Sequence, residues 1–310
     1  MSDGAALQVV AGVLRDAHGR VLLAQRMPPR DWAGRWEFPG GKRESGEDSH
    51  AALARELDEE LGIRIGPGTP LIRVPCAQGA RPIVLEVLQV PHWQGTPHAR
   101  EGQALQWLAP EQIVRTALPP ADWPVVLALR LPPLLRITPA DTTLGDLPRL
   151  LAVLQGDDAL LRLRLPDPAL ARTLASALIA ALPAARARIL LGGDIAGAQA
   201  LGCGVQLQAA QLAQLQQRPL PATAWCVASC HDAEDLARSA ALDCDAAVLG
   251  PVQPTATHPR APALGWAEWR TLRAALPLPV YAIGGLAPAD LAQARTQGAQ
   301  GVAGIRAFWA

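Results

Sequence analysis

The first third of the chain carries two different spacings of apolar residues. Four apolar runs, separated by polar turns such as RDAHGR, are typical of strands. These runs are residues 8–14, 21–26, 71–75 and 82–90. Between the second and third runs, leucines recur every fourth residue at 53, 57 and 61. That helical spacing predicts an amphipathic helix from about Asp48 to Leu61.

From Leu134 onward, short apolar runs alternate regularly with helical patterns rich in alanine and leucine. The runs are LLRITP, LLRLRLP, ARILLGG, GVQLQ, AWCVASC, AAVLGPV, PVYAIGG and GVAGIRA. Eight strands alternating with helices predict a small parallel (β/α)₈ barrel, with an open doubly wound sheet as the alternative. The Pro-rich segment 119–133 is a plausible linker. We therefore expect one α/β domain at 1–130 and a barrel domain at 134–310.

Composition narrows the class of partner. Arginine and lysine (28) balance aspartate and glutamate (28), so no basic field favours duplex nucleic acid or an anionic membrane. The five cysteines lack zinc-type spacing, and no uncharged apolar run reaches the roughly 18 residues of a membrane span. These features predict a cytoplasmic protein with reduced thiols that acts on a small molecule. They do not predict an oligomeric state.

The predicted helix at 48–61 carries an unusual cluster of carboxylates. Glu56, Glu59 and Glu60 are related by three and four residues, which places them on one helical face. Like charges at this spacing repel, and a divalent cation with oxygen ligands removes the repulsion. On clustering alone, a solvent-facing acidic surface is an equal alternative.

The spacing around this cluster distinguishes the alternatives. From Gly41 the chain runs five residues to Glu47 and seven more to Arg55-Glu56-Leu57-x-Glu59-Glu60-x-Gly62-Ile63. At every fixed position this resembles the Nudix box of pyrophosphohydrolases, which split a nucleoside diphosphate linked to a further group. The resemblance implies an N-terminal Nudix α/β/α sandwich with a mixed sheet.

The resemblance also implies a role for each residue of the motif. Mg²⁺, or Mn²⁺ in its place, would be bound by the carbonyl of Gly41 and by carboxylates; the acids are Glu56, Glu59, Glu60 and Glu101. Arg55 is expected to pair with Glu47 and hold the loop against the helix. Either Glu56 or Glu101 accepts the proton of the attacking water, and the sequence leaves this choice open.

Three flanking features resemble MutT-type enzymes, which hydrolyse 8-oxo-dGTP to 8-oxo-dGMP and diphosphate. Phe38, in WEFPGGK, matches a residue that stacks on the purine, and Arg26 matches an arginine that contacts the nucleotide. REGQ places Glu101 where these enzymes have a further metal-binding glutamate. Asp122, in PPADWPVV, stands where the family has a base-reading asparagine. Its alternative role is to cap the following helix.

The second half resembles the thiamine-phosphate synthase and TenI group of small barrels through GPVQPTAT and AIGG. In that group these loops hold phosphate at strand ends. The implied ligand contacts are Thr255, Thr257, Gly284, Gly285, Ser229 and His231. His231 is a candidate general base, or alternatively only the start of a helix.

The barrel departs from a complete synthase in its charged residues. RLRLP replaces a Q-x-R-x-K phosphate segment, and the chain's one lysine is Lys42, in the other half. Asp194 is at most one displaced magnesium ligand, and AAQL replaces an acid-bearing loop. We therefore expect a degenerate barrel that does not make thiamine phosphate.

The leading expectation is a Mg²⁺-dependent 8-oxo-dGTP diphosphatase that sanitises the nucleotide pool and so protects replication fidelity. One alternative is hydrolysis of a thiamine-precursor pyrophosphate, coupled to the barrel. A second alternative is a nucleotide-binding sensor without turnover, although the candidate catalytic acids are all present.

Overall fold

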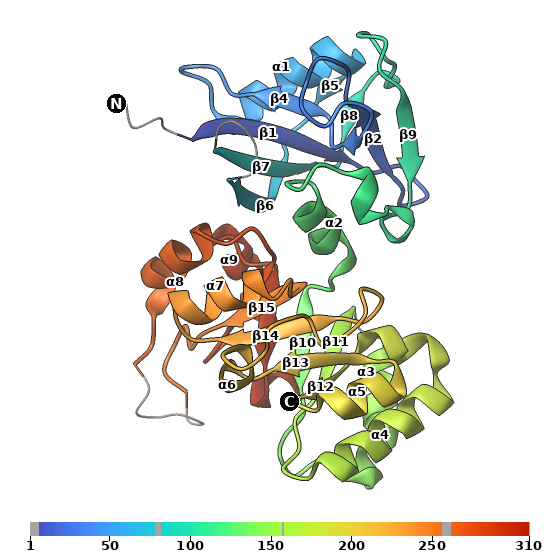
Figure 1. The fold of residues 1–310 in the computed structure, drawn as a ribbon, viewed down its shortest axis with the longest axis vertical. Helices are drawn as coiled ribbons and strands as arrows, with labels where there is room; N and C mark the ends of the chain where they lie inside the picture. Colours follow the sequence, from blue (N-terminus) through green and yellow to red (C-terminus); the bar gives the residue numbers. More distant parts are fainter. Residues whose placement is uncertain (1–5, 78–81, 157, 256–261, 310) are drawn as a thin grey trace. The chain divides into compact units, whose positions relative to one another are not determined.

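The computed structural model describes residues 6–77, 82–156, 158–255 and 262–309. The chain divides into two compact units, with the boundary between Arg130 and Leu131 (Figure 1). No helix among the described residues is long and apolar enough to cross a membrane.

The first unit is built on a mixed four-stranded sheet in the order β4-β1-β7-β6, in which β1 and β7 are parallel and the outer pairs are antiparallel. These strands are β1 (Leu7–Leu14), β4 (Gly40–Lys42), β6 (Thr69–Cys76) and β7 (Ile83–Val90). Two smaller antiparallel sheets flank it, β3-β2-β9 and β5-β8. Their strands are β2 (Val21–Gln25), β3 (Trp36–Glu37), β5 (Arg64–Ile65), β8 (Trp93–Gln94) and β9 (Leu105–Leu108).

Side chains that alternate between the two faces of β1 contribute to two separate cores in this unit. Val10 and Leu14 pack in the cluster that contains the leucines of α1 (Ser49–Leu61), whereas Ala11 and Val13 pack in the cluster that contains α2 (Trp123–Arg130). Successive side chains of a strand point to opposite faces, so the helices cover opposite faces of the sheet (Figure 1). The predicted α/β/α sandwich with a mixed sheet is therefore confirmed. Two 3₁₀ turns precede α2: η1 (Pro110–Gln112) and η2 (Arg115–Ala117).

The second unit is a closed parallel barrel in which each strand pairs with the next along the chain and β17 pairs with β10. Its strands are β10 (Leu134–Ile137), β11 (Ala159–Leu163), β12 (Ile189–Gly192), β13 (Gly204–Leu207), β14 (Cys226–Cys230), β15 (Ala246–Leu249), β16 (Val280–Ile283) and β17 (Gly301–Gly304). Each coincides with one of the eight predicted runs, so the barrel is confirmed and the open-sheet alternative is wrong.

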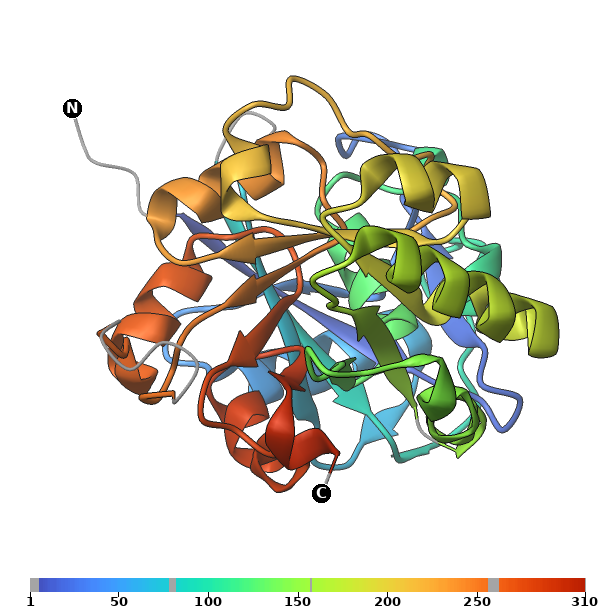
Figure 2. The same cartoon turned by 90° about the horizontal axis from the view of Figure 1, so that it is seen from below.

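Helices surround these strands (Figure 2). They are α3 (Leu147–Gly156), α4 (Pro168–Ala181), α5 (Ile195–Leu201), α6 (Ala209–Leu212), α7 (Ala233–Ala241), α8 (Gly265–Ala274) and α9 (Leu291–Thr296), with 3₁₀ turns η3 (Leu144–Asp146), η4 (Pro183–Arg188), η5 (Pro288–Asp290) and η6 (Arg306–Phe308). Outward-facing strand residues such as Leu161 and Leu163 pack in the same buried cluster as Leu174 and Leu178 of α4.

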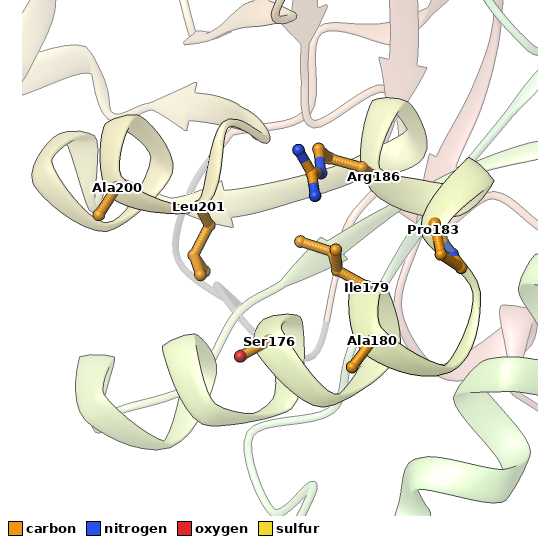
Figure 3. Close-up of a pocket in the computed structure, with 7 residues that line it drawn as sticks. All are labelled: Ser176, Ile179, Ala180, Pro183, Arg186, Ala200 and Leu201. Carbon is orange, nitrogen blue, oxygen red and sulfur yellow. The ribbon is translucent and has the colours of Figure 1, made fainter.

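A surface hollow lies between the C-terminal ends of α4 and α5 (Figure 3). Its lining residues are Ser176, Ile179, Ala180, Pro183, Arg186, Ala200 and Leu201. From there the chain continues from α4 through η4 to the start of β12, and from α5 to the start of β13. The hollow is therefore at the end of the barrel opposite the loops that carry the candidate ligand contacts, and we assign no chemistry to it.

Candidate active site

Helix α1 starts and stops where its sequence provides caps. The side chain of Asp48 accepts a hydrogen bond from the backbone N–H of Ala51 at 2.7 Å. At the other end Gly62 adopts a left-handed conformation (φ 67°), and its N–H donates to the carbonyl of Asp58 at 3.0 Å. Glycine, which lacks a Cβ atom, adopts this conformation without strain, so the glycine of the motif ends the helix. The acidic face of α1 is thereby fixed in length and position.

The three acids of α1 differ in their exposure. The side chains of Glu60 and Glu56 are only 9% and 15% exposed, whereas that of Glu59 is 57% exposed. Glu60 Oε2 accepts a hydrogen bond from the N–H of Gly40 at 3.3 Å. A Cβ atom on Gly41 would overlap the Glu56 carboxyl group. The strand β4 thus lies directly against two carboxylates, and a side chain at position 41 would displace one of them.

Arg55 holds the preceding loop to α1. Its Nε donates to Glu47 Oε1 at 2.9 Å, its Nη1 donates to Glu56 Oε1 at 3.0 Å, and its Nη2 donates to the carbonyl of Lys42 at 3.0 Å. The hydrogen bonds from Arg55 lower the pKa of Glu47 to about 2. Arg55 therefore positions both the loop and a carboxylate of the acidic face.

Glu101 is brought to this face by a neighbour that the sequence analysis did not single out. The backbone N–H of Glu101 donates to Gln103 Oε1 at 3.0 Å, and Gln103 Nε2 donates to the carbonyl of Glu60 at 3.0 Å. Arg100 adds a second attachment, because its N–H also donates to the Glu60 carbonyl. The REGQ loop therefore caps the C-terminal turn of α1, and the glutamine of that motif was the available signal.

The acidic face has the chemistry of a divalent-cation site. Burial, followed by the negative charges of Glu101 and Glu56, raises the pKa of Glu60 to about 7. Such crowding destabilises the ionised acids until a cation offsets it. Among the residues described, no three acidic, histidine or cysteine side chains are gathered in a metal-binding arrangement. Arg55 and Arg30 contact the carboxylates instead. The hard oxygen donors and the close approach of the Gly41 backbone to the Glu56 carboxyl group nevertheless fit Mg²⁺ or Mn²⁺.

The residues predicted to recognise the base lie close to one another beside β3. Asp122 Oδ1 accepts a hydrogen bond from the N–H of Phe38 at 3.0 Å, and Arg26 pairs with Glu37. Arg26 Nε also donates to the carbonyl of Asp31 at 2.7 Å. The structure thus brings Arg26, Phe38 and Asp122 together, and it adds Glu37, which the sequence analysis did not single out.

The environment of these residues changes their expected roles. Burial, and then the negative charge of Glu37, raises the pKa of Asp122 to about 8. Asp122 precedes α2, but the hydrogen bond of its carboxyl group goes to Phe38 and not to the helix N-terminus. Phe38 is only 3% exposed, and its ring belongs to the core. Stacking of that ring on a base stays a prediction that requires the ring to be uncovered.

In the barrel, the two predicted phosphate loops lie against each other. The N–H of Gln253 donates to the carbonyl of Gly284 at 3.1 Å, and a Cβ on Gly284 or Gly285 would overlap the Pro251–Gln253 segment. Thr255 is at the end of this described segment, whereas Thr257 lies outside the described residues. Close approach of the loops therefore requires both glycines.

The remaining barrel candidates have protein partners. Ser229 Oγ accepts from Gln206 Nε2 at 2.9 Å, and His231 Nδ1 lies 3.2 Å from the carbonyl of Gly250. His231 directly precedes Asp232, the N-cap of α7, so its position fits the helix-start alternative as well as a base.

Asp194 does not serve a metal site in this arrangement. Both of its carboxylate oxygens bind Arg172, at 2.5 and 2.9 Å, and Oδ1 also caps α5 at Gly197. Nearby, burial and the positive charge of Arg164 lower the pKa of Arg162 to about 10. The residues at these positions do not fit the magnesium site of a synthase.

Comparison with known proteins follows the same division. Residues 6–129 match the NUDIX domain family, and residues 136–308 match the thiamine monophosphate synthase (TMP-TENI) family. A CTP pyrophosphohydrolase of Escherichia coli K12 is 43% identical over 122 residues, covering 39% of this chain and 90% of that protein. An 8-oxo-dGTP diphosphatase of Haemophilus influenzae is 36% identical, and the match covers 39% of this chain and 88% of that protein. An 8-oxo-dGTP diphosphatase of Escherichia coli K12 is 32% identical, and the match covers 40% of this chain and 96% of that protein. The chain therefore belongs to the Nudix family through its N-terminal unit and to the thiamine monophosphate synthase family through its barrel.

Proposed function

We propose that the N-terminal unit hydrolyses a nucleoside triphosphate to the monophosphate and diphosphate, with 8-oxo-dGTP as its principal substrate. The observation that carries this proposal is that the acidic face and the candidate base-recognition residues lie at the same short segment of chain. The acidic face of α1 lies beside Gly40 and Gly41. Two residues before Gly40, the backbone N–H of Phe38 donates to the buried carboxyl group of Asp122. A site for phosphate chemistry and a site for base recognition are therefore adjacent along one segment.

The residues of the acidic face have complementary tasks in this proposal. A divalent cation held by Glu56, Glu59, Glu60, Glu101 and the Gly41 carbonyl would neutralise phosphate charge and acidify a bound water. Glu56 or Glu101 accepts the proton of the water. Glu101 is the more exposed of these two side chains, at 49% against 15%, whereas Glu56 is held in place by Arg55.

Asp122 supports the choice of an oxidised purine. With its raised pKa the carboxyl group is protonated at neutral pH, so it presents one O–H donor beside an acceptor oxygen. Oxidation of guanine at C8 turns N7 from an acceptor into an N–H donor next to the acceptor O6. A neutral carboxyl group pairs with that edge, whereas the N7 and O6 of unmodified guanine are both acceptors.

A cytosine nucleotide is the second candidate, and one observation favours it. Position 122 is an acid, and acidic side chains accept from the N4 amino group of cytosine. The relative at 43% identity is named a CTP pyrophosphohydrolase. In this case Asp122 or Glu37 would accept from the amino group.

The test is the ratio of kcat/KM values of the full-length protein for 8-oxo-dGTP, dGTP, CTP and a thiamine-precursor pyrophosphate, each with Mg²⁺. Our proposal predicts that 8-oxo-dGTP exceeds dGTP by at least tenfold and is the best of the four. Preference for CTP would establish the second candidate. Fast turnover of the thiamine precursor would assign the activity to the pathway of the barrel, and nucleotide binding without turnover would indicate a sensor.

A further inference from the structure

Arg30 lies in the loop between β2 and β3, which is closed at its base by Arg26. The N–H of Arg26 donates to the carbonyl of Arg35 at 2.8 Å, and the N–H of Gly34 donates to the carbonyl of Arg26 at 2.9 Å. Arg26 Nε also holds the carbonyl of Asp31. These contacts close the loop into an arch, and Arg26, a candidate nucleotide-binding residue, lies at the base of this arch.

From this arch the guanidinium of Arg30 reaches two carboxylates on different elements. Its Nη1 lies 3.9 Å from Glu60 Oε1, on α1, and its Nη2 lies 3.8 Å from Glu101 Oε2, in the REGQ loop. Both distances exceed that of a direct hydrogen bond, and the side chain is 50% exposed. Arg30 therefore acts as a loosely held counter-charge that can leave without breaking a tight contact.

The other arginine at this face does not have that freedom. Arg55 donates to Glu47, to Glu56 and to the carbonyl of Lys42 at distances of 2.9 to 3.0 Å. Its side chain is also less exposed, at 26%. The two arginines thus divide the acidic face: Arg55 fixes its geometry, and Arg30 offsets charge where the candidate metal ligands Glu60 and Glu101 approach each other.

We propose that Arg30 couples metal binding to triphosphate binding. Without metal, its guanidinium stands between Glu60 and Glu101. It gives up this place to the divalent cation, because two positive charges at one position repel. The freed guanidinium then contacts the phosphate oxygens of the nucleotide, for which its planar fork is suited. The second half of this inference rests on the proposed function, whereas the first half concerns the nucleotide-free protein.

The first half is tested by Mn²⁺ titration of nucleotide-free, full-length protein, with free Mn²⁺ followed by electron paramagnetic resonance. Arg30→Gln removes the competing charge and should tighten Mn²⁺ binding about two- to fivefold, the range of an exposed ion pair. Arg20→Gln is the matched control: Arg20 is similarly exposed, at 46%, and pairs with Asp16 in the turn before β2. Equal or weaker Mn²⁺ binding by Arg30→Gln would overturn the proposal.

The second half is tested by the KM for the nucleotide at saturating Mg²⁺. Arg30→Gln should raise KM about tenfold with little change in kcat. Arg30→Lys keeps the charge but loses the planar fork, so its KM should lie between those of the wild type and Arg30→Gln. A KM that Arg30→Gln leaves unchanged contradicts the transfer to phosphate. Absence of turnover in every variant and in the wild type would refute the proposed function, and the Mn²⁺ titration would still decide the first half.

Discussion

The carboxyl group of Asp122 accepts a hydrogen bond from the backbone N–H of Phe38, 84 positions earlier in the chain, at 3.0 Å. This bond joins the start of α2 to the loop that leads into the acidic face. Because the acid is buried beside Glu37, its pKa is raised to about 8. In the proposed function, the protonation of this one side chain sets which base the site accepts.

The first prediction concerns the pH dependence of substrate choice. Asp122 donates a hydrogen bond only while protonated, so its discrimination is present below its folded pKa of about 8 and is lost as the pH rises through that value. The ratio of kcat/KM for 8-oxo-dGTP over dGTP should fall between pH 7 and 9 in the wild type. It should be independent of pH in Asp122→Asn. Taking a ratio at each pH cancels titrations shared by both substrates, and a flat wild-type ratio would contradict this role.

The second prediction concerns Glu56. Glu56→Gln keeps the shape of the side chain but removes a candidate metal ligand and base, so kcat should fall by about 10²- to 10⁴-fold. The melting temperature should change little, because the substitution relieves repulsion from Glu60 while it weakens the ion pair with Arg55. Steady-state kinetics and thermal unfolding measure both effects. Glu44→Gln, at an exposed position of the loop between β4 and α1, is the control and should retain full activity.

A third prediction follows from the close approach of β4 to α1. In Gly41→Ala the added methyl group would overlap the Glu56 carboxyl group and push it away from the cation site. We expect at least a tenfold loss of kcat and weaker Mn²⁺ binding, with the circular dichroism spectrum unchanged. Gly156→Ala places the same methyl group where no heavy atom lies within 4 Å, and it should behave as the wild type.

Sequence patterns predicted those parts of the fold in which one residue type repeats at the spacing of its element. The leucines of α1 and the eight apolar runs of the barrel mark their helix and strands closely, since burial requires those spacings. The helical spacing of Glu56, Glu59 and Glu60 likewise predicted that these acids would share a face. The pairing of Glu47 with Arg55 is also present in the structure, at 2.9 Å.

The contacts that sequence patterns missed depend on the tertiary fold. Nothing local to Arg30 indicates that it would face Glu60 and Glu101, because the contact depends on how its loop arches. Burial of the Phe38 ring is equally non-local, since the other members of its buried cluster include residues of β1, β2, β6, β7 and α2. The displacement of Asp194 onto Arg172 requires α4 and α5 to lie side by side.

The fourth prediction separates the barrel from the Nudix activity. Asp194→Ala removes the cap of α5 and the ion pair with Arg172, so it should lower the free energy of unfolding of the barrel by about 1 kcal/mol. Nucleotide hydrolysis should be unchanged, and neither variant nor wild type should form thiamine phosphate from the synthase substrates with Mg²⁺. Calorimetry and a product assay measure these effects. Synthesis by the wild type that Asp194→Ala abolishes would show that the aspartate serves a metal after all.

The most direct test of the central claim is the identity of the phosphate product when the full-length protein hydrolyses 8-oxo-dGTP with Mg²⁺, followed by ³¹P nuclear magnetic resonance. We predict equal amounts of 8-oxo-dGMP and diphosphate, formed by the wild type and lost in Glu56→Gln. Release of orthophosphate would contradict the claim, because the terminal phosphoryl group would then be removed in place of diphosphate. An unchanged rate in Glu56→Gln would also contradict it, because the acidic face of α1 would then not be the site of hydrolysis.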